Sequence, residues 1–421
     1  MHQHRVIIIG AGLGGLTLAH GLRARGFDVA VYERDPHPDH RPQGYRVQLD
    51  EPGLAGLESC LPEHLFRLGL ATAASPPARV SVRDRHLGVL GDRPTAPGPD
   101  PSGSTDRPHR SYAFNRPTLR QILLFGLEST VRYGAELLSW ERRQDGTVAA
   151  RFTDGRSANA DLLVGADGVG SAVRALLLPQ ARVEDAGLRL IYGRIPLHPR
   201  AARAGEADRA AEADGSADVL PPWVFDSIFT VVTGGPGSPH VGFGPVRFDR
   251  PPGEAGPAHS PAVPLAPVGD YIACMVGAPA DHPDVPPFPE LRGLGGPALR
   301  ELAGRLMGDD WHPDVHRLLA HWDPSSLFPL RVSTARPVPP WEAGPVTLLG
   351  DAIHAMSPVL AMGANTAIRD AAELTRTLAV AADSRTPLVD AVRAYELRMT
   401  EYAFPIVAAS QRTGRQRIGQ K

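Results

Sequence analysis

The N-terminal segment RVIIIGAGLGGLTLAHGLRARGFDVAVYERD carries the pattern that most restricts how this chain folds. Val6 to Ile9 is a short apolar run typical of a buried strand, Leu13 to Arg25 has helical spacing, and Val29 to Tyr32 is a second strand-like run. Two strands joined by one helix predict a parallel pair, in a sheet that is covered on both faces. The chain is therefore predicted to open with a βαβ unit of an α/β fold.

The turn between this first strand and the helix satisfies the G-x-G-x-x-G pattern. Its glycines permit a tight turn, a close approach of pyrophosphate and close helix packing, and the N–H groups at the helix start attract phosphate. Glu33, about 20 residues further on, can accept hydrogen bonds from an adenosine ribose, and Arg34 follows it. These residues predict a dinucleotide site, for FAD or for NAD. The turn residues assigned to the cofactor are Gly10, Gly12, Leu13, Gly14 and Gly15.

Length, charge and cysteine content limit the class of protein. At 421 residues the chain is long enough for two or three domains, and a net charge of −2 offers no basic surface for nucleic acid. Cys60 and Cys274 cannot build a disulfide framework or a cysteine-rich zinc site, so no metal is expected. Without a signal-peptide pattern or an apolar run of about 18 residues, the chain is predicted to be cytoplasmic and free of membrane contact. Both a monomer and a homodimer are compatible with the sequence.

The middle of the chain has a different pattern. Strand-like runs at 223–233, 240–248 and 271–276 indicate an inserted domain that contains a sheet. The stretches rich in proline and glycine are predicted to be loops, and one part of them, 200–218, has a short exposed helix as its alternative. These loop stretches are 92–109, 199–222, 250–267 and 279–290.

From residue 346 the α/β pattern returns, with a strand in VTLLGD and a helix over 365–379. A closing helix is predicted over 388–412, interrupted near Pro405. The nucleotide-binding domain is thus predicted to be discontinuous in sequence. The predicted division is this nucleotide-binding domain over 1–75, 110–180 and 330–385, a substrate domain over 76–109 and 181–329, and a C-terminal helical segment over 386–421.

Two further motifs extend the dinucleotide site beyond its ADP half. In ADLLVGADGVGSAVRALL, a strand leads into a turn that contains Asp167 and Gly168. In VTLLGDAIHAMSPVLAMGANTAIRDAAEL, Gly350 and Asp351 end a strand, where a carboxylate can accept hydrogen bonds from a ribityl chain. The helix that follows Gly363 presents N-terminal amides, whose positive partial charge would stabilise an anionic reduced flavin ring.

Together these motifs resemble the single-component FAD-dependent aromatic hydroxylases, the group of para-hydroxybenzoate hydroxylase. The glycine, Asp-Gly and Gly-Asp motifs stand in the family's order and spacing, and GDAIHAMSP with GANTAIRDAAEL is the most specific likeness. The resemblance covers most of the chain and is loose between 179 and 339. It implies a Rossmann-like FAD-binding domain of the glutathione-reductase type, an inserted α+β substrate domain on a mainly antiparallel sheet, and C-terminal helices.

The resemblance also implies roles for particular residues. The glycine turn and Glu33 would hold the ADP half of FAD, Asp167 would lie by the pyrophosphate, and Asp351 would bind the ribityl and pyrophosphate region. Arg116, in FNRPTLRQILL, would point toward the flavin. The family usually has Gly where this chain has Ala361, and a methyl group there is strained if φ is positive. The residues implied to lie against the isoalloxazine are Pro358, Gly363, Ala364 and Asn365.

The activity that the resemblance implies is a flavin monooxygenase of secondary metabolism. NADPH or NADH would reduce the flavin, O₂ would add to its C(4a), and the hydroperoxide would insert one oxygen atom into an aromatic or polyketide-like small molecule. Epoxidation or Baeyer–Villiger ring expansion are alternative outcomes. A reductase or dehydrogenase that does not activate oxygen, or a flavoprotein with a sensing role, would share the architecture. A halogenase is disfavoured because W-x-W-x-I-P is absent.

The sequence assigns no catalytic side chain. His354 is the one candidate, and the favoured interpretation is a hydrogen-bonding partner near the flavin loop. Candidate substrate contacts lie on the strand-like runs of the middle domain, although alternating apolar residues more often form a core. These candidates are Trp223, Phe225, Phe243 and Met275.

Overall fold

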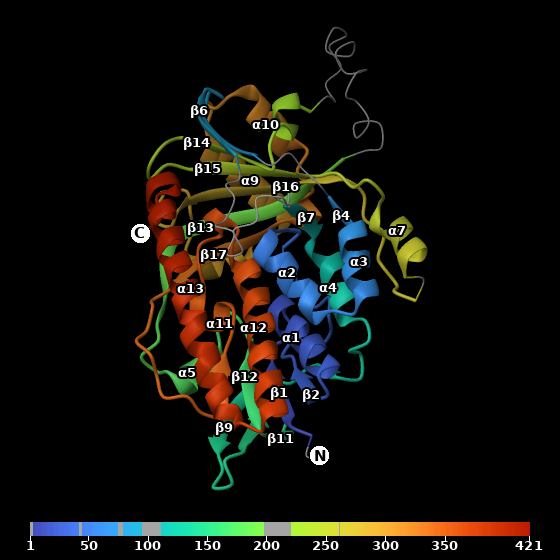
Figure 1. The fold of residues 1–421 in the computed structure, drawn as a ribbon. Helices are drawn as coiled ribbons and strands as arrows, with labels where there is room; N and C mark the ends of the chain where they lie inside the picture. Colours follow the sequence, from blue (N-terminus) through green and yellow to red (C-terminus); the bar gives the residue numbers. More distant parts are fainter. Residues whose placement is uncertain (1–2, 42–43, 75–78, 95–110, 198–219, 261) are drawn as a thin grey trace.

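The computed structural model describes residues 3–41, 44–74, 79–94, 111–197, 220–260 and 262–421. Its lower half in Figure 1 is built on a five-stranded parallel sheet with the order β18-β12-β1-β2-β8. Every neighbouring pair in it is parallel, as the βαβ pattern predicts. The strands are β1 (Arg5–Ile9), β2 (Asp28–Tyr32), β8 (Val131–Arg132), β12 (Leu162–Gly165) and β18 (Val346–Leu348).

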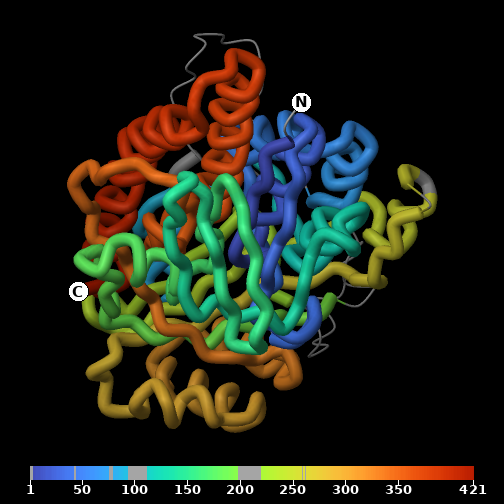
Figure 2. Tube along the Cα trace, turned by 90° about the horizontal axis from the view of Figure 1, so that it is seen from below, coloured from blue at the N-terminus to red at the C-terminus, as the bar shows by residue number. Residues whose placement is uncertain are grey.

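Both faces of this sheet are covered. Helices lie on one face, with α1 (Leu13–Ala24) against α12 (Gly363–Ser384), and α12 against both α2 (Glu51–Cys60) and α13 (Leu388–Ile418) (Figure 1). A three-stranded antiparallel sheet covers the other face, and Figure 2 shows it beside the parallel strands. Its strands are β9 (Leu137–Arg142), β10 (Val148–Phe152) and β11 (Ser157–Ala160). Phe152 stacks on Tyr32 with 4.2 Å between ring centroids, which ties this sheet to the parallel one.

The upper half contains a seven-stranded sheet with the order β17-β13-β16-β15-β14-β5-β6 (Figure 1). All its pairs are antiparallel except β14 with β5. Its strands are β5 (Arg79–Asp84), β6 (Val89–Pro94), β13 (Val183–Pro196), β14 (Phe229–Thr233), β15 (His240–Val246), β16 (Tyr271–Pro279) and β17 (Phe328–Ala335). This arrangement confirms the predicted fold class. The domain boundaries themselves stay a prediction.

Shorter elements connect the two halves. A small antiparallel sheet has the order β3-β7-β4, and its strands are β3 (Arg46–Leu49), β4 (Ala73–Ala74) and β7 (Tyr112–Asn115). The remaining elements are α3 (Glu63–Ala71), α4 (Arg116–Leu124), α5 (Ala172–Leu177), α7 (Pro252–His259), α8 (Phe288–Gly293), α9 (Gly296–Met307), α10 (Pro313–Ala320), α11 (Asp351–His354) and the 3₁₀ turns η3 (Pro222–Phe225), η4 (Pro324–Ser326) and η5 (Pro358–Leu360).

Local predictions differ from the structure at several points. The run 223–233 forms strand only from Phe229, since Trp223 lies in a 3₁₀ turn. The predicted loop 250–267 contains α7, and α9 and α10 were not predicted at all. The alternative helix over 200–218, like residues 95–110, lies outside the described residues.

The closing helix α13 is not interrupted at Pro405. It runs unbroken through that residue to Ile418. Proline removes one backbone hydrogen bond from a helix interior. Apolar residues on both sides of the proline, Ala403 and Val407, are buried. Their packing holds the segment in helical register, and tertiary contact therefore overrides the local signal here.

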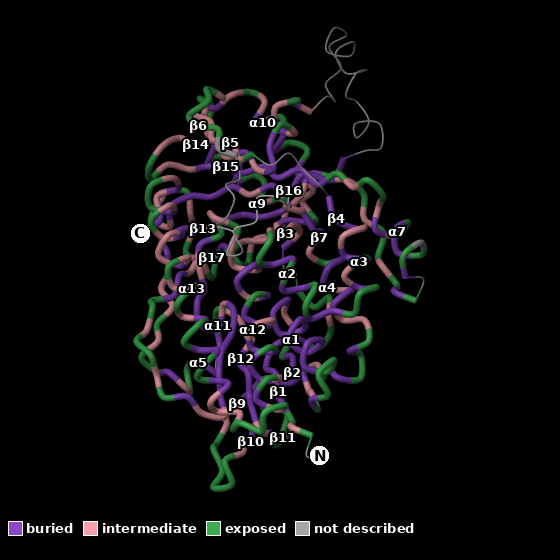
Figure 3. Tube along the Cα trace, viewed as in Figure 1, coloured by how far each residue is buried: buried purple, intermediate pink, exposed green. Residues whose placement is uncertain are grey.

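Buried residues are concentrated in the parallel strands, in α1 and α12, and on the strands of the large sheet (Figure 3). One core surrounds Val6, Ile7 and Ile8, and a second lies between the large sheet and α9 and α10, around Leu302 and Trp322. Within the described residues, no helix combines the length and apolar character that a membrane span requires.

The contact between α13 and β18 includes one buried carboxyl group. Glu396 is 6% exposed and accepts a 2.8 Å hydrogen bond from Thr347 Oγ1. Burial raises the pKa of Glu396 to about 7, and the Thr347 hydroxyl offsets only part of this rise. The folded state thus keeps the proton to a higher pH than the unfolded chain, in which a glutamate titrates near about 4.3.

We expect this group to make the protein less stable as the pH rises. Between pH about 4.3 and pH about 7 the folded state binds more protons than the unfolded state, so the free energy of unfolding falls across this window. Glu396→Gln should remove that slope and add roughly 2–3 kcal/mol at pH about 8, in urea unfolding. The exposed Glu401→Gln on the same helix is the control. An unchanged slope in Glu396→Gln would contradict the assignment.

Candidate functional site

The sequence motifs meet at one edge of the parallel sheet. The glycine turn follows β1, Glu33 follows β2, Asp167 follows β12 by two residues, and Asp351 follows β18 by three. Since these strands are parallel, their carboxyl ends lie at the same edge. Ligands of such sheets bind in the crevice outside these ends. The tertiary structure therefore brings four separated segments into one site.

The glycine turn is packed tightly on its inner side and open on its outer side. Gly10 has φ of 108°, and a Cβ there would clash with the carbonyl oxygen of Ala166. A Cβ on Gly15 would clash with the carbonyl oxygen of Gly10, and one on Gly14 would lie 2.8 Å from Leu349 Cδ1. A Cβ on Gly12, in contrast, would meet no atom within 4 Å. The open side is where a pyrophosphate could approach.

The helix that starts at Leu13 is not capped by a side chain and has no acidic residue in its first turn. The same holds for α12, which starts at Gly363, with Ala364 next. N-terminal amides without a protein partner attract anions. The structure therefore presents two helix N-termini with free donors.

Glu33 is buried and holds the turn in place. Its Oε2 accepts from the N–H of Ala11 at 2.8 Å, and its Oε1 accepts from the N–H of Asp35 at 2.9 Å. A carboxylate has about four lone-pair positions, so each oxygen can still accept one bond from a ribose hydroxyl. Arg34 lies exposed at the surface next to it.

Asp167 serves mainly as a helix cap. It accepts from Ser171 Oγ at 2.5 Å and from the N–H of Ala172 at 2.7 Å, at the start of α5. Gly168 has φ of 76° and lets the chain turn into this cap. The segment also contacts the glycine turn, since a Cβ on Gly10 would lie 2.9 Å from Asp167 Cα. Asp167 is thus adjacent to the predicted pyrophosphate position, with its carboxylate committed to the protein.

Asp351 is different, because no described residue donates a hydrogen bond to it. It follows Gly350, which has φ of 61°, and a Cβ on Gly363 would lie 3.8 Å from Asp351 Oδ1. Burial raises the pKa of Asp351, and the nearby charges of His354 and Arg116 offset part of this rise. A half-buried carboxylate without a donor, beside a helix N-terminus, is suited to accept hydroxyl groups from a ligand.

The loop after α11 is clamped from behind by Asn365. Its Nδ2 donates to the carbonyl oxygens of Gln48 at 3.0 Å and Ala361 at 3.1 Å, and its Oδ1 accepts from the N–H of Asp50 at 3.0 Å. The Asn365 side chain is therefore fully used within the protein, and only its backbone remains for a cofactor. Pro358 starts the 3₁₀ turn that this clamp holds.

Ala361 adopts the left-handed conformation, with φ of 55° and ψ of 23°. The position therefore has the positive φ at which the sequence predicts strain. The conformation costs an L-residue about 1–2 kcal/mol.

We expect Ala361→Gly to stabilise the protein by about 0.5–1 kcal/mol, because glycine removes the strain at a smaller cost in backbone entropy. Thermal unfolding measures this change. Ala382→Gly, within the helix α12, is the matched control and should lose about 1 kcal/mol. A loss of stability in Ala361→Gly similar to that control would contradict the strain at this loop.

His354 lies behind the Gly-Asp turn and is not among the residues that line the two cavities described below. It is fully buried, and its Nε2 donates to Asp370 Oδ2 at 2.6 Å. Asp370 also accepts from the N–H of Gly350 at 2.8 Å and from the Tyr402 hydroxyl at 2.6 Å. Burial opposes protonation of the imidazole, but the Asp370 carboxylate outweighs it and raises the pKa of His354. This placement supports a role in holding the turn.

Two arginines of α4 face the site. Burial lowers the pKa of Arg116, and the charge of Asp351 offsets part of this fall, which places the two groups near each other. One helical turn later, Arg120 donates from Nε to the carbonyl oxygen of Ala11 at 3.3 Å and from Nη1 to that of Pro38. Its buried Nη2 has no partner among the described residues. Arg120 was not predicted from the sequence, although its i+4 spacing from Arg116 places both on one helix face.

A cavity of about 310 Å³ adjoins the loop from Pro358 to Ala361, where the sequence predicts contact with the flavin. It lies between the large sheet, the loop from Pro358 to Ala361, and the last turn of α13. Most of its lining is apolar, including Val80, Val82, Leu190, Phe229, Val231 and Met275. A cavity of this size and character can hold a small aromatic molecule.

Of the four predicted substrate contacts, Met275 lines this cavity and the other three do not. Phe243 is fully buried in the second core, and Trp223 packs on it with 5.8 Å between centroids. Phe225 lies under the guanidinium of Arg247. Neighbouring side chains on a strand point to opposite faces, so Phe243 must point away from the cavity that Gly242 lines. In the sequence VGFG, glycine alternates with larger apolar residues. This pattern indicates that one face of the strand leaves open space.

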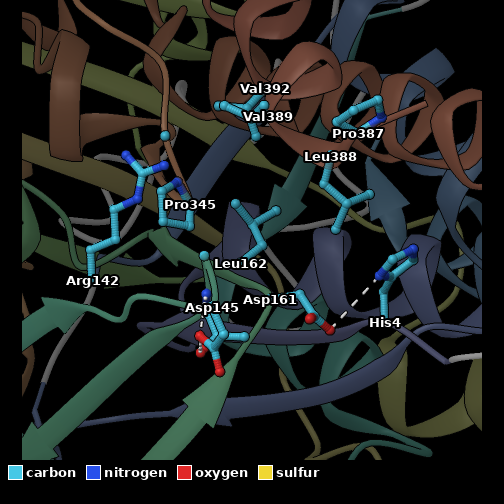
Figure 4. A pocket seen from close by; sticks show the side chains of 13 residues that line it. His4, Arg142, Asp145, Asp161, Leu162, Pro345, Pro387, Leu388, Val389 and Val392 are labelled. Atoms are coloured by element: carbon cyan, nitrogen blue, oxygen red, sulfur yellow. Dashed lines mark hydrogen bonds and ion pairs between the residues drawn. The ribbon is translucent and has the colours of Figure 1, made fainter.

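A second cavity, of about 260 Å³, lies at the opposite edge of the parallel sheet (Figure 4). It is lined by residues at the amino ends of strands, such as Asp161 and Pro345, and by Leu388 at the start of α13. His4 Nδ1 lies 3.8 Å from Asp161 there. This cavity is separate from the glycine turn and belongs to no predicted site. The described residues contain no cluster of three His, Cys, Asp or Glu side chains suited to a metal.

The residues at the carboxyl edge fit an FAD molecule. Open space at Gly12, two uncapped helix N-termini, and the Asp351 carboxylate without a protein donor lie along one edge. These features match a pyrophosphate and a ribityl chain in chemistry. NAD has no ribityl chain to occupy the Asp351 side of the site.

Comparisons with known proteins agree with this geometry. The FAD binding domain family matches residues 3–191 and 311–392. The chain is 30% identical to 3-amino-4-hydroxybenzoate 2-monooxygenase of Streptomyces platensis, over 99% of this chain and 88% of that protein. It is 29% identical to the dual O-methyltransferase/FAD-dependent monooxygenase of Cercospora beticola, over 99% of this chain and 46% of that protein. The chain thus spans about half the length of that relative.

A solved structure of a candidate FAD-containing monooxygenase from Photorhabdus luminescens matches with a TM-score of 0.78 and 29% identity, over 99% of both chains. The family match covers the glycine turn, Asp167 and Asp351, which is the edge of the sheet where the site lies. The chain therefore belongs to the FAD binding domain family of the single-component FAD-dependent aromatic hydroxylases.

Proposed function

We propose that this protein is an FAD-dependent monooxygenase that uses NADPH or NADH and O₂ to insert one oxygen atom into a small molecule. The observation that carries the proposal is the apolar cavity beside the loop from Pro358 to Ala361. A substrate bound there would lie next to the flavin loop, with the sheet and α13 shielding it from water.

Bound FAD would supply hydride acceptance and oxygen activation, which no amino-acid side chain provides. The residues of this protein would bind the cofactor and orient it. The turn at Gly12 and the α1 amides would hold the pyrophosphate, Glu33 the ribose, and Asp351 the ribityl chain. The α12 amides at Gly363 and Ala364 would place positive partial charge where a reduced ring carries negative charge. Asn365 fixes the loop through its three hydrogen bonds.

The substrate class is inferred from the cavity and from the relatives. The cavity lining is mostly apolar, which favours an aromatic or polyketide-like molecule. One relative is named for a hydroxylated aromatic acid, 3-amino-4-hydroxybenzoate. The nicotinamide cofactor would dock transiently, because the sequence has no second glycine fingerprint for it.

The purified holoenzyme tests the proposal. It is mixed anaerobically with NADPH or NADH and a panel of hydroxylated aromatics, and oxygen is then admitted. The expected result is oxygen consumption with a product heavier by one oxygen atom, labelled when ¹⁸O₂ is used. Substrate reduction without oxygen consumption would overturn the proposal in favour of a reductase. Flavin retention without turnover of any compound would favour a binding role.

A further inference from the structure

The charged residues in the described lining of the cavity beside the loop from Pro358 to Ala361 are all cationic. Arg46 and Arg417 line it, and no Asp or Glu is found among the described residues of the lining. His240, which also lines it, is neutral because burial lowers its pKa to about 4. Arginine stays protonated throughout the accessible pH range. The described lining is therefore mostly apolar, with two guanidinium groups and no carboxylate.

Arg46 is the cation that the protein itself leaves incompletely paired. Its Nη2 donates to the carbonyl oxygen of Ile228 at 3.1 Å, and its buried Nε has no hydrogen-bond partner. No carboxylate lies within ion-pair distance of Arg46 among the residues that the structure describes. A half-buried guanidinium normally has an acidic partner, because a buried charge is costly without one.

The surroundings of Arg46 hold it in position. Its backbone N–H donates to the Tyr192 hydroxyl at 3.2 Å, at the start of β3. A Cβ on Gly244 would lie 3.2 Å from Arg46 Nε and Cδ, so this glycine makes room for the side chain on the sheet. Gly242, on the same face of β15, lines the cavity next to it. Gly242 and Gly244 therefore leave space on one face of β15, and the Arg46 guanidinium lies in this space at the cavity wall.

We propose that Arg46 is the specificity-determining residue for the substrate and pairs with an anionic oxygen on an aromatic ring system. A guanidinium binds carboxylate and phenolate oxygens through charge-assisted hydrogen bonds. The ring system occupies the apolar lining between Phe229 and Met275, and the anionic oxygen lies at the Arg46 end. The inference rests on the proposed function for the identity of this cavity as the substrate site.

Binding to the FAD-loaded protein, without NADPH, NADH or turnover, tests Arg46 separately from the oxygen chemistry. Isothermal titration calorimetry at a fixed pH of about 8 compares 2-naphthoate with its methyl ester, and 4-nitro-1-naphthol, ionised at that pH, with its methyl ether. Each pair differs in charge on one oxygen. We expect the anion to bind at least about tenfold more tightly than the neutral partner. The pair with the larger ratio identifies carboxylate or phenolate as the preferred anion.

Three variants assign the effect to one side chain. Arg46→Met should lower anion affinity at least about tenfold and leave the neutral ligands within about threefold, whereas Arg46→Lys should keep part of the preference. Arg417→Met is the matched control, since Arg417 lines the same cavity. It should leave the ratio unchanged. Flavin content and circular dichroism confirm that each variant is folded.

The outcomes separate clearly. Equal affinity for anion and neutral partner in the unmodified protein, or no binding by any of the four probes, would overturn the proposal without any variant. Loss of the preference in Arg417→Met and its retention in Arg46→Met would assign the anion to Arg417 and also overturn it. An intact preference in a protein that fails the oxygenation assay would refute the proposed function alone.

Discussion

Asp351→Ala is expected to lose most of its FAD while the folded protein remains as stable as before. Asp351 receives no hydrogen bond from the described residues, and burial raises its pKa, so its ionised carboxylate costs stability at neutral pH. Removing it should not lower the free energy of unfolding. Hydrogen bonds to a charged group contribute about 1.5–3 kcal/mol, which predicts roughly 10–100-fold weaker FAD binding.

The ratio of flavin to protein absorbance and a fluorescence titration of the apoprotein with FAD measure this loss. Urea unfolding of the apoprotein measures stability. Asp309→Ala, an exposed carboxylate in the large-sheet half of the molecule, is the matched control and should change neither quantity. An Asp351→Ala protein that keeps its full flavin content would remove the central residue of the site. A loss of both flavin and stability would instead assign Asp351 a structural role.

Asp370→Asn is expected to lower the free energy of unfolding by about 3–5 kcal/mol. The Asp370 carboxylate is fully buried and accepts from Gly350, His354 and Tyr402, two of these contacts being at 2.6 Å. The asparagine side chain has the same shape, but only its one oxygen can accept a hydrogen bond. Its NH₂ group would face a group that also donates, since both oxygens of Asp370 accept hydrogen bonds. Breaking a buried charge-assisted network by changing one partner typically costs this much.

Urea unfolding of the apoproteins measures the loss, with the exposed Asp383→Asn on the same helix as the control. Tyr402→Phe removes only one donor and should lower the free energy of unfolding by about 1 kcal/mol. This variant still tests the hydrogen-bond network if Asp370→Asn does not fold. Because Asp370 holds the N–H of Gly350, both variants should also weaken FAD retention in the order of their instability. A change below about 1 kcal/mol in Asp370→Asn would contradict the network.

The predicted cofactor site was easier to recognise from the sequence than the cavity proposed for the substrate, for a physical reason. Gly10, Glu33 and Asp351 perform local tasks whose requirements appear within a few residues: a tight turn, a strand end and a helix start. Their motifs therefore predicted both the elements and the edge of the sheet where they meet. Asn365 shows the limit of this reasoning. Its motif position is recognisable, but its side chain bonds to Gln48 and Asp50, more than 300 residues away in sequence.

The cavity beside the loop from Pro358 to Ala361 depends on which face of each strand points inward and on the register between distant segments. Gly242 pairs with Met275 across β15 and β16, and Arg46 reaches the same face from a different sheet. A shift of one residue in either strand would exchange Gly242 for Phe243 at the cavity. No short motif carries that information, so the sequence does not indicate that Met275 and Arg46 line one cavity while Trp223 and Phe243 do not.

The sequence by itself determined the dinucleotide fold, because a tight turn, a strand end and a helix start follow from local backbone requirements and short spacings. Its resemblance to the aromatic hydroxylases implied FAD as the cofactor and strain at Ala361. Only the tertiary structure decided which charged groups are satisfied by the protein and which are left for a ligand. Neighbouring N–H groups donate to the carboxylates of Asp167 and Glu33, whereas no described residue donates to Asp351 and the Nε of Arg46 has no described partner. That difference arises because hydrogen-bond partners come from segments far apart in the chain, and only folding brings them within reach.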